Sequence, residues 1–75
     1  MSITIKLFAS LREQFGQDEL TLSTTPRTVQ AAWQCVSQQS PPANLLAAVN
    51  HDYVDFDHPL RDGDEVAFFP PVTGG

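Results

Sequence analysis

The sequence predicts an α+β fold, in which one main helix packs on one face of a mixed sheet of four to five strands. Three observations lead to this prediction. Segments near both ends of the chain alternate apolar and polar residues, as half-buried strands do. One segment near the middle has apolar residues at helical spacing, and a length of 75 residues allows a single domain. A helix laid on a sheet buries the apolar face of both.

The N-terminal part of the chain predicts two strands with a short helical turn between them. In the first strand, residues 3–8, Ile3, Ile5 and Leu7 point to one side and Thr4, Lys6 and Phe8 to the other. Phe8 is unusual because it lies on the polar side. The segment Ser10–Phe15 predicts a helical turn that Gly16 ends. The second strand is predicted at residues 19–23, where leucines alternate with polar residues.

The main helix is predicted to begin after Thr28, whose side chain is a suitable N-cap. Val29, Ala32, Trp33 and Val36 follow at helical spacing and form one apolar face. The helix is expected to end near residues 38–40, before two prolines.

The C-terminal part of the chain predicts two or three more strands. Residues 45–50 indicate a central strand, 53–56 a short edge strand and 66–69 the final strand. Asp62-Gly63 indicates a turn before the final strand, since glycine accepts positive φ. If the first and last strands are neighbours, the helix covers the face carrying Ile3 and leaves Phe8 and Phe69 uncovered. We expect residues 1–69 to form the domain and residues 70–75 an extended tail.

Composition excludes several classes of protein. The formal net charge is −5, and the four basic residues are scattered, so no positive footprint for nucleic acid is expected. No stretch is long and apolar enough to predict a membrane span, and a single cysteine excludes an internal disulfide. These features predict a cytoplasmic protein. A domain this small rarely builds a deep cleft, which argues against an enzyme acting alone.

The remaining polar residues do not predict a catalytic or metal site. Cys35 has no neighbour in sequence that would activate its thiol, so we interpret it as incidental. His51 and His58 lie among aspartates, but their spacing matches no known ligand pattern. No metal and no permanently bound cofactor are expected.

The end of the chain, "GDEVAFFPPVTGG", suggests a delivered C-terminus. Pro70 and Pro71 favour an extended path, along which the tail would reach roughly 19 Å from the last strand. Gly74 and Gly75 lack side chains that would block a narrow channel. A carboxylate there needs activation, most simply as an acyl-adenylate made with ATP. The alternative is a frayed terminus without a role.

These residues resemble the sulfur-carrying small subunit of molybdopterin synthase, the MoaD family. The match lies mainly in "LAAVN" (46–50) and "FDHPLRDGDEVAFFPPVTGG" (56–75), with "LFASLRE" (7–13) as a weaker mark. The resemblance implies a β-grasp, ubiquitin-like fold. It further implies that a MoeB-like, E1-like enzyme uses ATP to adenylate Gly75, that a sulfurtransferase supplies sulfur, and that the resulting thiocarboxylate serves a MoaE-like large subunit in a heterotetramer. There the sulfur builds the dithiolene of molybdopterin from a cyclic pyranopterin precursor.

The resemblance also implies roles for single residues. In the tail, Gly75 carries the sulfur, Gly74 permits threading, Val72 and Thr73 line the inserted segment, and Pro70 and Pro71 set its reach. On the body, Phe8, Tyr53 and Phe69 form a hydrophobic dock, with Arg12 and Arg61 at its polar rim. Two alternatives share the tail: a ThiS-like carrier for thiazole synthesis, and a ubiquitin-like protein modifier.

Overall fold

The structure is a computed structural model that describes residues 2–38, 41 and 44–70. Its elements are, in order, β1 (Ile3–Leu7), α1 (Ser10–Phe15), β2 (Glu19–Leu22), α2 (Val29–Ser37), β3 (Leu46–Val49), β4 (Asp52–Val54) and β5 (Glu65–Phe69). The five strands form one sheet in the order β2-β1-β5-β3-β4. β1 and β5 are parallel, whereas the other neighbouring pairs are antiparallel. The predicted mixed sheet and the pairing of its first and last strands are confirmed.

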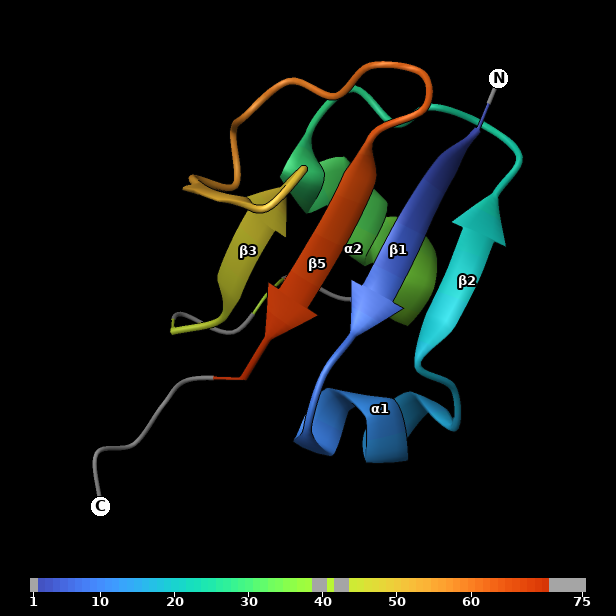
Figure 1. Ribbon diagram of the computed structural model, residues 1–75, viewed down its shortest axis with the longest axis vertical. Helices are drawn as coiled ribbons and strands as arrows, with labels where there is room; N and C mark the ends of the chain where they lie inside the picture. The colour runs from blue at the N-terminus through green and yellow to red at the C-terminus, as the bar shows by residue number, and fades with distance from the viewer. Residues whose placement is uncertain (1, 39–40, 42–43, 71–75) are drawn as a thin grey trace.

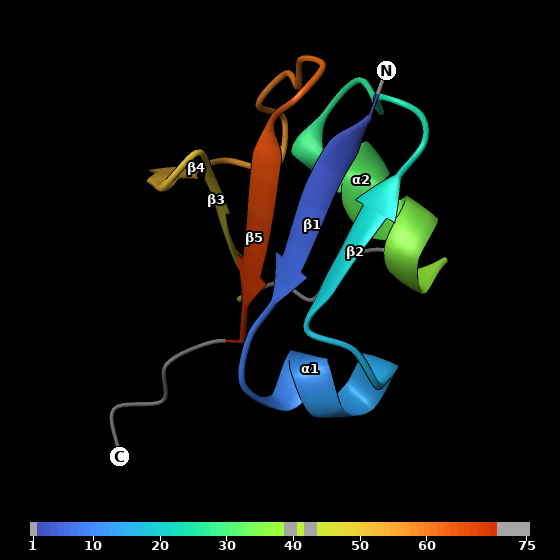
Figure 2. The same cartoon turned by 45° about the vertical axis from the view of Figure 1, so that its right-hand side comes forward.

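The molecule has two layers, with α2 behind the sheet and α1 beyond the end of β1 (Figure 1). In the turned view, α2 lies on one side of the sheet and the described helices leave the opposite face open (Figure 2). The open face is therefore the only sheet face among the described elements that is available for contacts with another molecule.

The core lies between the sheet and α2, and it is built from the positions that alternation predicts. Its central member is Trp33 on α2, whose ring packs edge-on against Phe68 of β5, at a centroid distance of 5.0 Å, and against Phe15 of α1, at 5.8 Å. The other buried members of the cluster are Ile3, Ile5, Leu7, Leu11, Val29, Ala32, Leu45, Ala47, Val49, Leu60, Val66 and Phe68. Because α1 contributes Leu11 and Phe15, it closes the end of this core.

The predicted edge strand at 53–56 was misplaced: β4 is Asp52–Val54. Asn50 and His51 both have positive φ, 51° and 77°, as in the two-residue turns that join antiparallel strands. Such a turn reverses the chain direction within two residues, so β4 begins one residue earlier than expected. The sequence did not reveal the turn, because Asn-His lacks the glycine that normally marks it. β1, β2 and β5 differ from their expected ranges by one residue at one end, and β3 is one residue shorter at each end.

The predicted turn before β5 is confirmed by Gly63, which has a φ of 87°. Its N–H donates to the carbonyl oxygen of Ser2 at 2.7 Å. The Ser2 N–H in turn donates to Oδ1 of Asp62, also at 2.7 Å. These bonds hold the start of β1 beside the start of β5.

Thr28 caps α2 as predicted: its Oγ1 accepts a hydrogen bond from the N–H of Ala31 at 3.2 Å. We expect Thr28→Ala to lower the free energy of unfolding by about 1 kcal/mol, since one N–H of the first turn loses its partner. Urea unfolding monitored by the fluorescence of Trp33 measures this change. Thr24→Ala, in the exposed loop before the helix, is the control, and equal midpoints for both variants would contradict the capping role.

Candidate functional site

The open face of the sheet carries the aromatic side chains that we call the aromatic patch: Phe8, Tyr53 and Phe69. The rings of Phe8 and Phe69 are stacked, with centroids 4.7 Å apart and planes 12° apart. Tyr53 adds a tilted ring 5.9 Å from that of Phe69. Phe8 is 41% exposed and Tyr53 is 74% exposed. Large apolar groups that remain in water next to one another are typical of an interface.

Strand register explains why these rings meet. β1 and β5 are parallel, and Leu7 pairs with Phe68, so the next residues, Phe8 and Phe69, stand side by side. Leu7 and Phe68 point into the core, and alternation therefore turns Phe8 and Phe69 to the open face. The predicted sharing of one uncovered face by Phe8 and Phe69 is confirmed.

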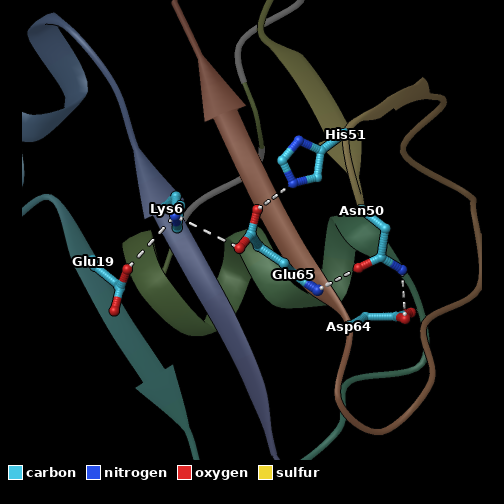
Figure 3. Close-up of polar contacts among 6 residues, drawn as sticks. All are labelled: Lys6, Glu19, Asn50, His51, Asp64 and Glu65. Atoms are coloured by element: carbon cyan, nitrogen blue, oxygen red, sulfur yellow. Dashed lines mark hydrogen bonds and ion pairs between the residues drawn. The ribbon is translucent and has the colours of Figure 1, made fainter.

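Charged residues occupy the part of the open face next to the patch, and we call them the charged cluster: Lys6, Glu19, His51 and Glu65. Lys6 Nζ lies 3.6 Å from Glu65 Oε1 and 3.9 Å from Glu19 Oε1. His51 Nε2 lies 3.5 Å from Glu65 Oε2. Figure 3 shows Glu65 on β5 between Lys6 and His51. This charged cluster is not predicted from the sequence, although alternation alone places Lys6 on the same face as Phe8.

Asn50 fixes the position of Glu65. Its backbone N–H donates to the carbonyl oxygen of Glu65 at 2.8 Å, and its Oδ1 accepts from the N–H of Glu65 at 3.0 Å. Its Nδ2 donates to Oδ1 of Asp64 at 3.0 Å (Figure 3). Two of these bonds tie the turn between β3 and β4 to Glu65, the first residue of β5, and the third ties it to Asp64 just before the strand.

The C-terminal tail begins at the aromatic patch, because Phe69 is the last residue of β5 and the half-buried Pro70 follows it. Pro71, Val72, Thr73, Gly74 and Gly75 lie outside the described residues. Their roles in sulfur transfer and insertion therefore remain predictions.

The structure separates the two arginines that were predicted at the rim of the dock. Arg12 on α1 lines a shallow hollow together with Phe8, next to the patch. Arg61 lies in the loop before β5 and lines a different hollow, with His58 and Pro59. Since Phe69 is at the far end of β5, Arg61 is not brought together with the aromatic patch. The order of residues along the chain could have revealed this separation, because Arg61 precedes the predicted final strand and Phe69 ends it.

Other chemistry is sparse in the part of the chain that the structure describes. Cys35 is exposed on α2. Within 2–38, 41 and 44–70, no three His, Cys, Asp or Glu side chains are grouped so that they could hold a metal ion. No described helix has the length and apolar character needed to cross a bilayer.

Comparison with known proteins identifies the chain. The profile of the ThiS family matches residues 5–75. The chain belongs to the ThiS family. A relative from Escherichia coli, named molybdopterin synthase sulfur carrier subunit, is 49% identical over 80 aligned positions, which cover 97% of this chain and 99% of the relative. The resemblance to molybdopterin synthase small subunits is thereby confirmed.

Solved structures confirm the β-grasp fold of this ThiS-family protein. A putative molybdopterin converting factor, subunit 1, from Pyrococcus furiosus has a TM-score of 0.79 at 28% identity, over 96% of this chain and 99% of that one. SAMP1, the small archaeal modifier protein 1 from Haloferax volcanii, has a TM-score of 0.83 at 25% identity, and the whole of both chains is covered. The same fold therefore occurs in a putative molybdopterin converting factor subunit and in a protein named as a modifier.

Proposed function

We propose that this ThiS-family chain is the sulfur carrier subunit of a molybdopterin synthase. The observation that carries the proposal is the near-full-length similarity to a carrier subunit at 49% identity. The structure adds a physical reason. The aromatic patch lies where β5 ends, so a partner that covers the patch lies next to Pro70, from which the chain continues to Gly74 and Gly75.

The proposed chemistry takes place at the carboxylate of Gly75. A MoeB-like enzyme uses ATP to form the acyl-adenylate and releases diphosphate. A sulfurtransferase then delivers sulfur at the oxidation level of sulfide, which bonds to the acyl carbon as AMP leaves, and this gives the thiocarboxylate. The thiocarboxylate sulfur bonds to the cyclic pyranopterin precursor, and water then cleaves the acyl–sulfur bond and regenerates the carboxylate of Gly75. A second charged carrier repeats the step and completes the dithiolene. Tethering the sulfur to the docked protein gives it a high effective concentration.

In this proposal the chain does not act as an enzyme alone. A MoaE-like large subunit provides the pocket and the catalytic side chains, and each heterotetramer holds two carriers. The aromatic patch supplies apolar contact area at the junction between body and tail. We place the process in the cytoplasm, where ATP for adenylation is available.

A protein modifier is the second candidate, favoured by the likeness to SAMP1. A modifier would use the same activated Gly75 to form amide bonds with lysines. A ThiS-like carrier for thiazole synthesis would also be charged with sulfur but would serve another acceptor. The three candidates therefore differ in the molecule that receives the activated acyl group or its sulfur. They share the same folded domain.

The test is the intact mass of the protein from cells that make the molybdenum cofactor, followed by reconstitution. We expect a fraction of the chains to be heavier by the difference between sulfur and oxygen, and to lose this difference after reaction with a purified large subunit and precursor. Gly-Gly remnants on lysines of other proteins, without sulfur on Gly75, would instead support the modifier. Sulfur that only a thiazole-forming enzyme accepts would support the ThiS-like carrier.

A further inference from the structure

A hollow of about 250 Å³ lies on the open face between the aromatic patch and the charged cluster. Ala48 and Ala67 are part of its lining, on the neighbouring strands β3 and β5. Their small side chains leave room between the larger groups at the two sides. One side is formed by the aromatic patch, and the other by Lys6, His51 and Glu65.

The acceptor group in this hollow is the carboxylate of Glu65. Its contacts with Lys6 and His51, at 3.6 and 3.5 Å, are longer than the roughly 2.7–2.9 Å of a charge-assisted hydrogen bond. None of the described residues donates a hydrogen bond to it. The backbone of Glu65 is nonetheless held by Asn50. The backbone that carries the carboxylate is thus fixed, and the carboxylate itself retains capacity to accept hydrogen bonds.

From this geometry we infer that the hollow receives an arginine side chain of the synthase large subunit. A guanidinium is planar, stacks on aromatic rings and donates two parallel hydrogen bonds to a carboxylate. The open face carries both kinds of group that a guanidinium binds, namely the rings of the aromatic patch and the carboxylate of Glu65. The net charge of −5 favours a basic partner surface. The inference rests on the proposed function, because that function supplies the partner.

Lys6 does not prevent this binding. Its ammonium lies between two carboxylates, 3.6 Å from Glu65 and 3.9 Å from Glu19. When a guanidinium approaches Glu65, Lys6 retains Glu19 as a counter-ion. An ammonium group in place of the guanidinium would be a poorer fit, since it is compact, strongly hydrated and unable to stack as a plane.

The test compares Glu65→Gln with Glu19→Gln in titrations of the full chain against the purified large subunit. Both variants lose one negative charge and one contact with Lys6, but only Glu65 lines the hollow. We expect Glu65→Gln to weaken binding about tenfold, and Glu19→Gln to change it by less than about twofold. Thermal unfolding of both variants verifies that they are folded. Equal affinities of the two variants would overturn the inference.

A second measurement identifies the partner group. Each surface arginine of the large subunit is changed singly to Lys, and its effect is measured with the wild-type chain and with Glu65→Gln. We expect one arginine whose replacement weakens binding to wild type but has little further effect on Glu65→Gln. If no arginine shows this coupling, the inference is wrong although the proposed function stands. If the wild-type chain does not bind the large subunit, both are overturned.

Discussion

Removal of Gly75 is expected to reduce molybdopterin formation to the background rate. In the proposed mechanism the thiocarboxylate forms on the terminal residue. A chain that ends at Gly74 would present its carbonyl one residue, about 3.3–3.6 Å, short of the reacting position in the large subunit. Misplacement of reacting atoms by this much removes the advantage of tethering. The measurement is formation of molybdopterin from precursor by the reconstituted synthase.

The fold provides the control for this experiment. Every buried core residue in the described part of the chain lies within 3–68, so loss of Gly75 removes none of them. We expect the truncated chain to unfold at the same urea concentration as the wild type and to bind the large subunit still. A chain with extra residues at its N-terminus should retain activity, whereas extra residues after Gly75 should abolish it. Sulfur transfer by either C-terminal variant would refute the mechanism.

Replacement of Phe69 by Asp is expected to weaken binding of the large subunit about a hundredfold. Phe69 contacts both other members of the aromatic patch, with ring centroids 4.7 Å from Phe8 and 5.9 Å from Tyr53. A central aromatic residue of this kind contributes 2 kcal/mol or more to many interfaces, and about 1.4 kcal/mol corresponds to a factor of ten. A buried carboxylate without a partner adds a further cost.

Calorimetric titration with the large subunit measures this effect. Thr21→Asp is the matched control, because it adds the same charge on the open face but lies on β2, which is not next to β5. We expect the control to bind within about twofold of the wild type, as surface charges at a distance are largely screened. Phe69 would be excluded from the interface if the two variants bound equally well.

The aromatic patch illustrates how far the sequence leads towards the site. Alternation along β1 and β5 places Phe8 and Phe69 opposite the core, and this is readable from the sequence. Their stacking at 4.7 Å requires more, namely that the two strands be parallel neighbours with Leu7 paired to Phe68. Tyr53 joins the patch only through β4 and β3, which the turn at Asn50 and His51 sets in register.

Arg12 and Arg61 show a case in which the structure separates residues that were expected to lie together. The family resemblance assigns both to the rim, but Arg61 lies in the loop before β5 and Phe69 at the end of that strand. Glu65 was not considered, although it pairs across the sheet with Thr4 and shares the open face with Lys6. Its contacts come from Lys6 on β1 and from Asn50 and His51 in the turn between β3 and β4, which are distant from it in sequence, so no local pattern marks it.

The sequence by itself determined the order of strands and helix, the cap and the apolar face of α2, the turn at Gly63 and the family. These depend on local backbone preferences, on side-chain periodicity and on motifs read along the chain. Only the tertiary structure decided which side chains share the open face at contact distance, how Asn50 holds Glu65, and where the hollow lies. Those relations depend on strand pairing and register, which are set by packing of the whole core between residues far apart in the chain.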